Sequence, residues 1–246
     1  MRLDTLNFCS HIRAWRERRK SLNRLTEAVK RIGGKELLYV INRPDKLFNA
    51  VFALNAWQGE QSRSGRGSDL DNTVAIRTAL PKLLEKLEIK ILLDLPCGDF
   101  NWMQRTKLNL DLYIGADCVG DLIVQNRERY SAPKRQFIVC DIVRDPLPTA
   151  DLLLCRDLLV HLSYVDIHRA LRNIRHSGTR WLLTTQFIAP ERTNSDILTG
   201  DWRPLNFCHP PFNLPKPRIL IDECYTAEDG RWRDKHLALW AVDDLL

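Results

Sequence analysis

The sequence contains no long run of apolar residues. Within its 246 residues, no stretch approaches the roughly 20 consecutive apolar side chains of a membrane-spanning helix. Its first residues also lack the apolar core and small-residue cleavage site of a secretory signal peptide. We therefore expect a soluble, cytoplasmic protein without a transmembrane segment.

Cysteine is present, but not in the patterns of a disulfide framework or a zinc site. The seven cysteines are odd in number, and no two have CxxC spacing. Four of them, Cys97, Cys118, Cys140 and Cys155, lie at or beside predicted strand ends, where a small polarisable side chain packs well. We expect reduced thiols and no metal.

The GxGxxG motif of dinucleotide-binding enzymes is also absent. The turn after the first predicted strand reads Asp94-Leu-Pro-Cys-Gly98-Asp-Phe and has a single glycine. A pyrophosphate requires close approach of the backbone at a helix N-terminus. The turn therefore disfavours a nicotinamide cofactor.

Positive charge, by contrast, is abundant and concentrated near the N-terminus. The chain has a formal net charge of +6, and ten Arg and Lys residues fall within positions 1–35. Trp15, Leu22 and Val29 recur every seven residues in this segment, which predicts one apolar stripe on a helix. We interpret residues 1–55 as a basic helical extension, docked on the rest of the chain, on a membrane surface or on a partner.

Short apolar runs follow one another from residue 89 onward, and helical patterns separate several of them. Continuous apolar runs are typical of strands that helices cover on both faces. The pattern predicts an α/β fold with a mostly parallel sheet, with strands at 89–95, 112–116, 136–141, 152–155, 181–186, 218–224 and 236–242 and helices at 120–130 and 164–175.

Three features of the predicted elements depend on particular residues. The helix at 164–175 opens with Ser163-Tyr-Val-Asp166, a variant of the capping box. A helix at 69–87 has Ser68 or Asp69 available as its cap. The last two strands are expected to join through a turn at Asp229-Gly230.

The segment 58–68, between a predicted helix at 45–55 and the helix at 69–87, is rich in glycine and serine. Such a composition predicts a loop. We interpret its part from Ser62 to Ser68 as a lid over a ligand site, with a plain connection as the alternative.

Acidic residues occupy the predicted strand ends, and ligands of open parallel sheets bind outside the carboxyl ends of the strands. Asp94, Asp117, Asp141 and Asp157 have such positions. Asp117 follows Gly98 by 117 − 98 = 19 residues, close to the roughly 20 that separate a nucleotide-binding glycine turn from the carboxylate on the ribose hydroxyls. Asp141 is then expected to accept from the adenine amino group.

The single glycine and the neighbouring acids favour S-adenosylmethionine (SAM) as the ligand. SAM has no phosphate, and its ammonium and sulfonium groups suit the carboxylates of Asp94 and Asp99. The predicted cofactor-binding residues are Asp94, Pro96, Cys97, Gly98, Asp99, Trp102, Asp117, Asp141 and Arg156.

These strand-end segments resemble successive cofactor motifs of class I SAM-dependent methyltransferases. The resemblance runs from about Asn55 to the C-terminus and implies a domain of residues 56–246, with a Rossmann-like seven-stranded sheet whose last strand is antiparallel. Pro96 and Cys97 stand where many members carry glycine. A narrower resemblance, to a group of methyltransferase-domain proteins, rests on residues 57–68, 93–103, 155–163 and 200–206.

Asp157 and His161 are the predicted catalytic residues. They are four positions apart, so one helical turn places them on the same face. A hydroxyl acceptor must lose its proton, and the unperturbed pKa of histidine suits that task. The alternatives are that His161 braces the helix at Ser163 and that Asp157 forms an ion pair with Arg156.

The proline-rich loop 199–217 is the predicted acceptor site. Arg203, Asn206 and His209 lie there among aromatic residues, a combination that suits a sugar or a carboxylate; a plain surface loop is the alternative. The sequence thus favours methylation of an oxygen or nitrogen of a small molecule or saccharide.

Two other functions stay open. An RNA or DNA methyltransferase would use the basic N-terminal segment for phosphate contacts, but the sequence has no Pro-Pro-Tyr-type tetrad and no RNA-binding module. A non-catalytic protein with a SAM-binding fold is the other alternative.

Overall fold

The computed structural model describes residues 44–57, 59–226 and 230–245. The predicted basic helix within the first 43 residues lies outside these ranges, so the extension stays a prediction, as does the turn at Asp229-Gly230. In the described part of the chain, no helix has both the length and the apolar content needed to cross a bilayer.

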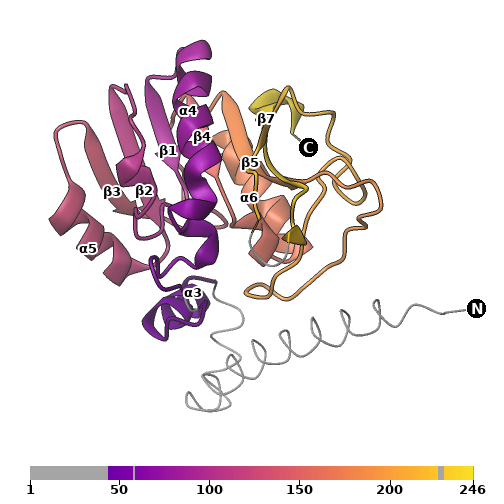
Figure 1. The fold of residues 1–246 in the computed structure, drawn as a ribbon, viewed down its shortest axis with the longest axis horizontal. Helices are drawn as coiled ribbons and strands as arrows, with labels where there is room; N and C mark the ends of the chain where they lie inside the picture. The colour runs from indigo at the N-terminus through magenta and orange to yellow at the C-terminus, as the bar shows by residue number, and fades with distance from the viewer. Residues whose placement is uncertain (1–43, 58, 227–229, 246) are drawn as a thin grey trace, which may run out of the picture.

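The centre of the molecule is a seven-stranded sheet (Figure 1) with the strand order β3-β2-β1-β4-β5-β7-β6. The first five strands in sequence pair in parallel, and β7 runs antiparallel to both of its neighbours. The predicted α/β class and the antiparallel last strand are therefore confirmed. The strands are β1 (Ile91–Asp94), β2 (Leu112–Asp117), β3 (Arg135–Val139), β4 (Leu152–Cys155), β5 (Trp181–Phe187), β6 (Ile219–Asp222) and β7 (Lys235–Ala241).

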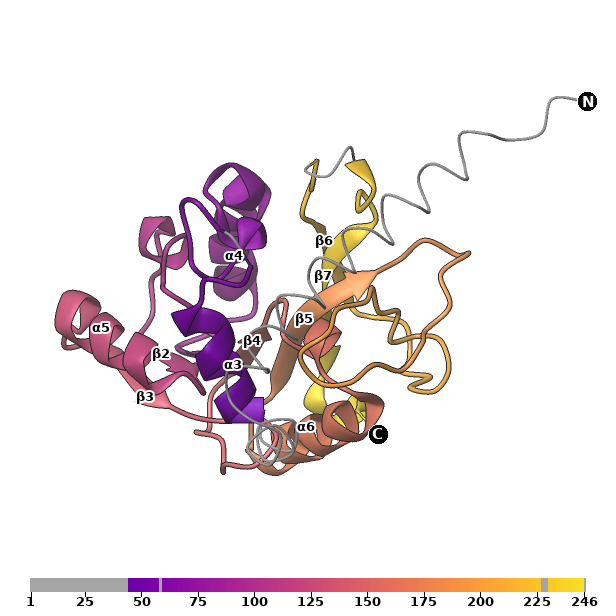
Figure 2. The same ribbon diagram turned by 90° about the horizontal axis from the view of Figure 1, so that it is seen from below.

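Helices cover both faces of this sheet (Figure 2). The α-helices are α3 (Pro44–Ala53), α4 (Val74–Lys86), α5 (Gly120–Tyr130) and α6 (Tyr164–His176). Short 3-10 turns lie at Arg66–Ser68, Asp71–Thr73, Met103–Arg105, Leu159–His161 and Val242–Asp244. Figure 2 shows α4 and α5 on one face and α6 on the other.

The spacing of apolar residues explains why α6 lies where it does. Its buried side chains, Ile167, Ala170, Leu171 and Ile174, recur at intervals of three and four residues. They form one stripe that faces the sheet. Burial of each large aliphatic side chain contributes about 1.5–3 kcal/mol, so this stripe fixes the helix on the sheet.

Ser163 caps α6 as predicted. The return hydrogen bond of the capping box, from the Ser163 amide to the Asp166 carboxylate, runs through Thr199. The Ser163 Oγ accepts a hydrogen bond from the Asp166 amide at 3.2 Å. The Ser163 amide donates to Thr199 Oγ1 at 3.0 Å, and that hydroxyl donates to the Asp166 carboxylate at 2.6 Å. Thr199 therefore ties the proline-rich loop to the start of α6.

The predicted cap of α4 is wrong. The helix begins at Val74, and neither Ser68 nor Asp69 caps it, because the turns at Arg66–Ser68 and Asp71–Thr73 delay its start. The side chain of Thr73, the residue before the helix, donates instead to the Asp69 carbonyl at 2.9 Å.

Candidate functional site

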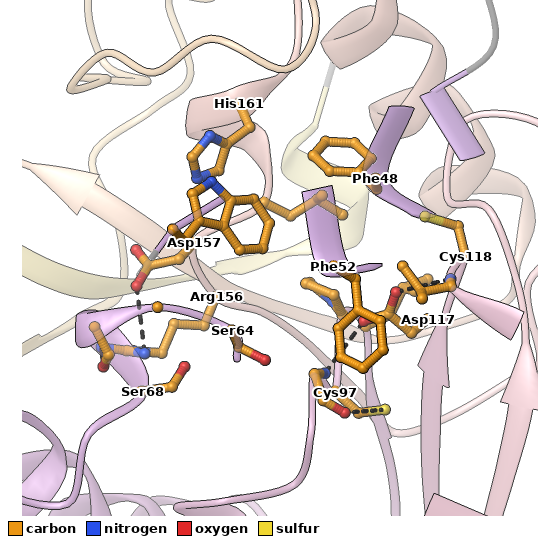
Figure 3. A pocket seen from close by; sticks show the side chains of 18 of the residues that line it. Phe48, Phe52, Ser64, Ser68, Cys97, Asp117, Cys118, Arg156, Asp157 and His161 are labelled. Atoms are coloured by element: carbon orange, nitrogen blue, oxygen red, sulfur yellow. Dashed lines mark hydrogen bonds and ion pairs between the residues drawn. The ribbon is translucent and has the colours of Figure 1, made fainter. Parts of the chain in front are cut away.

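A cavity of about 310 Å³ opens at the carboxyl edge of the sheet. Its lining comes from the ends of β1, β2 and β4, from the segment after β3, from α3, from the loop 63–68 and from the β6–β7 connection. Figure 3 shows Phe48 and Phe52 of α3 beside the same space as Asp117 and Asp157. Ligands of parallel sheets bind at this edge.

The turn after β1 is held against the end of β2. The Asp117 carboxylate accepts from the Gly98 amide at 3.2 Å and from the Val119 amide at 3.0 Å. Gly98 has a φ of +53°, and a Cβ there would lie 2.3 Å from Ser64 Oγ. Only glycine therefore fits this position, which the loop at Ser64 approaches closely.

Two carboxyl groups in this turn region have raised pKa values. Burial raises the pKa of Asp117 to about 6, opposed by the backbone amides that bind it. Burial raises the pKa of Asp94 to about 7, against the hydrogen bond that the Tyr113 hydroxyl donates to it at 2.6 Å. Burial also raises the pKa of the Cys97 thiol, which is therefore neutral at pH 7.

Eight of the nine predicted cofactor residues line the cavity: Asp94, Pro96, Cys97, Gly98, Trp102, Asp117, Asp141 and Arg156. Asp99 does not, which corrects its predicted role. Its carboxylate turns toward the loop and accepts from the Ser62 hydroxyl and the Arg63 amide, both at 2.9 Å. Asp99 thus anchors the loop rather than facing the ligand space.

A second anchor holds the same loop over the end of β4. Arg156 donates to the Gly67 carbonyl at 2.9 Å. A Cβ at Gly67 would lie 3.0 Å from the Asp157 carboxylate. The loop therefore lies directly on the site, as a lid would, and its closure over a ligand stays a prediction.

Both predicted catalytic residues line the cavity (Figure 3). The Asp157 carboxylate lies 2.7 Å from Lys235 Nζ and 3.3 Å from Arg156 Nη1, and it accepts from Thr185 Oγ1 at 3.1 Å. Burial would raise the pKa of Asp157, but the two cations outweigh burial and hold that pKa well below its usual range. Asp157 is therefore ionised at every physiological pH.

His161 ends the turn that follows β4 and lies beside Trp57, with ring centroids 5.4 Å apart. Its Nδ1 is 2.8 Å from the Asp201 carbonyl. A carbonyl only accepts, so Nδ1 carries the proton and Nε2 has the lone pair. Burial lowers the pKa of His161, against the Asp201 hydrogen bond and the Asp157 charge. The neutral ring is thus a base.

Sequence reasoning missed Glu223 and Lys235. Lys235 Nζ lies 3.2 Å from the Glu223 carboxylate, and Arg156 binds the same carboxylate at 2.7 Å. With Asp157 these residues form a buried charge quartet. Because β7 is antiparallel, its first residue lies at the same edge as the carboxyl ends of the parallel strands, and this rule would have found Lys235.

The three predicted acceptor-binding residues do not line the cavity, and the structure corrects that prediction. The Arg203 guanidinium is buried and donates to the carbonyls of Leu159, Val160 and Leu162 at 3.1, 2.8 and 2.6 Å. Asn206 accepts from the Gln186 amide at 2.8 Å, and His209 Nδ1 lies 3.2 Å from the Arg192 carbonyl. These side chains hold the proline-rich loop together.

Replacing Arg203 with alanine is expected to destabilise the fold. Three carbonyls lose a hydrogen bond from a charged donor, and such bonds contribute about 1.5–3 kcal/mol each. The expected loss of about 3 kcal/mol or more corresponds to a fall in Tm of roughly 6–12 °C in a chain of this size. The matched control is Arg218→Ala, whose side chain is 54% exposed and pairs with Asp244; a similar fall in both variants would contradict the role given to Arg203.

No family model matches the chain, and no curated protein matches it in sequence. Solved structures do match. Human N-acetylserotonin methyltransferase in complex with SAM is 15% identical, with a TM-score of 0.53 over 90% of this chain and 66% of that one. Phosphoethanolamine N-methyltransferase 1 of Haemonchus contortus, in complex with phosphoethanolamine and S-adenosylhomocysteine, is 14% identical, with a TM-score of 0.56 over 80% and 48%.

The likeness shows the fold. The chain has the fold of class I SAM-dependent methyltransferases, as the motifs after β1, β2, β3 and β4 led us to expect. It spans about two thirds of the length of the human protein and about half of the Haemonchus protein.

Proposed function

We propose that this chain is a SAM-dependent methyltransferase that transfers a methyl group to an oxygen or nitrogen of a small molecule or saccharide. The observation that carries the proposal is the Asp117 carboxylate, which faces the cavity at the end of β2 beside the glycine turn at Gly98. This is where the fold binds the ribose of a nucleoside.

The residues around the cavity fit SAM. Asp117 would accept from the ribose hydroxyls, Asp141 would meet the adenine, and Asp94 would face the ammonium group of the methionine part. Gly98 lets the loop at Ser64 approach the turn, because a Cβ there would lie 2.3 Å from Ser64 Oγ. Bound SAM supplies an electrophilic methyl group on a sulfonium centre.

The residues at the end of β4 supply the base. His161 Nε2 would take the proton from an acceptor hydroxyl. The imidazolium that results is stabilised by the Asp157 carboxylate, whose charge already raises the pKa of His161. Much of the remaining acceleration comes from holding the two reactants in line and excluding water.

Calorimetry with S-adenosylhomocysteine and with NAD tests the proposal. The wild-type chain is expected to bind S-adenosylhomocysteine with a Kd on the order of micromolar, about −8 kcal/mol, and to give no heat with NAD. Binding of NAD alone would overturn the assignment, because the single-glycine turn would then be holding a pyrophosphate.

The affinity for S-adenosylhomocysteine is expected to fall as the pH is lowered from about 8 to about 5. Asp117, with a pKa of about 6, and Asp94, with a pKa of about 7, bind the ligand as carboxylates. Below those values protonation competes with binding, by up to about tenfold in Kd per pH unit for each group. Calorimetry across this range checks the trend, and a constant Kd would contradict it.

A further inference from the structure

Three aromatic side chains pack against one another at the end of the cavity that lies beyond β4, with Phe187 buried and the two Trp side chains partly exposed. Phe187, Trp202 and Trp232 all line the cavity and come from the end of β5, the proline-rich loop and the β6–β7 connection. Their ring centroids lie 4.6–6.0 Å apart, with interplanar angles of 66°, 79° and 86°. We call these three residues the aromatic box.

The box is braced from outside the cavity. The Arg192 guanidinium lies 5.3 Å from the Phe187 ring centroid and 5.0 Å from that of Trp232, and it forms an ion pair with Asp234. Arg192 is not among the cavity-lining residues. The ion pair fixes the rings without adding net charge to the cavity, so little side-chain entropy is lost when a ligand binds.

The charged groups beside the box offer mainly hydrogen-bond acceptors. In the buried charge quartet, the side chains of Lys235, Arg156 and Glu223 are 6%, 4% and 0% exposed, whereas that of Asp157 is 30% exposed. The two positive and two negative charges cancel. An occupant therefore meets the Asp157 carboxylate, and the lone pair of His161 Nε2 is the second acceptor.

This arrangement selects among acceptor chemistries. A carboxylate or phosphate would meet the partly exposed Asp157 carboxylate, whereas Arg156 and Lys235 are already paired with Asp157 and Glu223. An ammonium group would bind, but the carboxylate would stabilise its protonated form, which has no lone pair for methyl transfer. A phenol would also pack on tilted rings, edge to face, but a simple phenol brings one hydroxyl for the two acceptors. A saturated ring places C–H groups on tilted faces and donates through its hydroxyls.

We propose that the methyl acceptor is an uncharged saccharide ring with two neighbouring free hydroxyls, packed on the aromatic box and donating to Asp157 and His161. The inference rests on the proposed function and specifies its substrate class. One hydroxyl donates to Asp157 and orients the ring, and the other loses its proton to His161 and receives the methyl group. The products are the O-methyl saccharide, S-adenosylhomocysteine and a proton.

Ligand-observed saturation-transfer NMR tests the proposal on the chain loaded with S-adenosylhomocysteine. Four probe mixtures are compared: methyl pyranosides of common neutral sugars, amino sugars with small primary amines, phenols, and uronic acids with hydroxy acids. We expect transfer to the ring C–H protons of the neutral pyranosides. The Trp202→Ala variant should bind them about tenfold more weakly, the upper end of what one aromatic contact contributes.

Trp181→Ala is the matched control, because Trp181 begins β5 at the opposite edge of the sheet, contacts Arg218 and does not line the cavity. It should leave pyranoside binding unchanged. Preferential transfer to any other mixture, transfer to none, or an equal loss in both variants would overturn the inference. Calorimetry with S-adenosylhomocysteine separates the two proposals. If the wild-type chain does not bind S-adenosylhomocysteine, the proposed function is refuted. If it binds S-adenosylhomocysteine but no pyranoside, only the saccharide proposal is refuted.

Discussion

Replacing Asp117 with alanine is expected to lower the affinity for S-adenosylhomocysteine by about 10²- to 10⁴-fold. The ribose hydroxyls lose a carboxylate that accepts two hydrogen bonds, and bonds to a charged group contribute about 1.5–3 kcal/mol each. The carboxylate is also the acceptor for the Gly98 and Val119 amides, so its loss loosens the glycine turn. Titration calorimetry at a pH of about 8 measures the effect.

Asp111→Ala is the matched control for this experiment. Asp111 precedes β2, its side chain is 69% exposed, and its carboxylate pairs with Lys134 at 3.7 Å. Its removal should change neither the affinity nor the Tm by a measurable amount. An Asp117→Ala variant that keeps a wild-type Kd would show that the nucleoside part of the ligand lies elsewhere, and the proposed function would fail with it.

The His161→Gln variant is expected to lose about 10²- to 10⁴-fold in kcat on a hydroxyl acceptor, the usual contribution of a positioned general base. Glutamine keeps a polar side chain that can form hydrogen bonds, but it cannot accept a proton at neutral pH. Because burial lowers the pKa of His161 below its ordinary 6.5, the wild-type kcat should be level near neutrality. It should fall as the pH drops through that lowered pKa, since the protonated ring is not a base. In the His161→Gln variant, this fall in kcat at low pH (the acid limb of the profile) should be absent.

A structural role for His161 would give a different result. If its main task is to hold the loop at Asp201, the variant should lose Tm and change KM, while kcat and the acid limb stay as in the wild type. His168→Gln is the control, because His168 lies on α6, packs beside Phe212 and does not line the cavity. Release of S-adenosylhomocysteine, followed from about pH 5 to about pH 8, distinguishes the two roles.

Most of the fold follows from local patterns in the chain. The bounds of α5 and β4 agree with the predicted ranges, and those of β2 and α6 differ by one residue. Apolar periodicity is a property of neighbouring residues, so it can be found without the tertiary structure. The capping of α6 by Ser163 is local for the same reason, whereas the start of α4 depends on how the loop at 62–68 packs.

The position of the cavity was also predictable. Strand ends of a parallel sheet converge at one edge whatever the loops do, and this places Asp94, Asp117, Asp141 and Asp157 around one cavity. Which side chains face the cavity was not predictable in this way. Arg203, predicted to bind the acceptor, and Asp99, predicted to bind the cofactor, have suitable chemistry. Their side chains nevertheless turn toward backbone carbonyls and loop groups, and a residue's position in the sequence does not give the direction of its side chain.

What the sequence determined by itself is the order of elements, the parallel sheet and the acids at its carboxyl edge, because each depends on residues close together in the chain. Only the tertiary structure decided which groups lie together at the β5 end of the cavity. Lys235 contacts Asp157 across 78 positions, and the aromatic box joins residues from three separate segments. Contacts of that range depend on the assembled sheet, since the local sequence does not specify the relative position of two segments that meet only after folding.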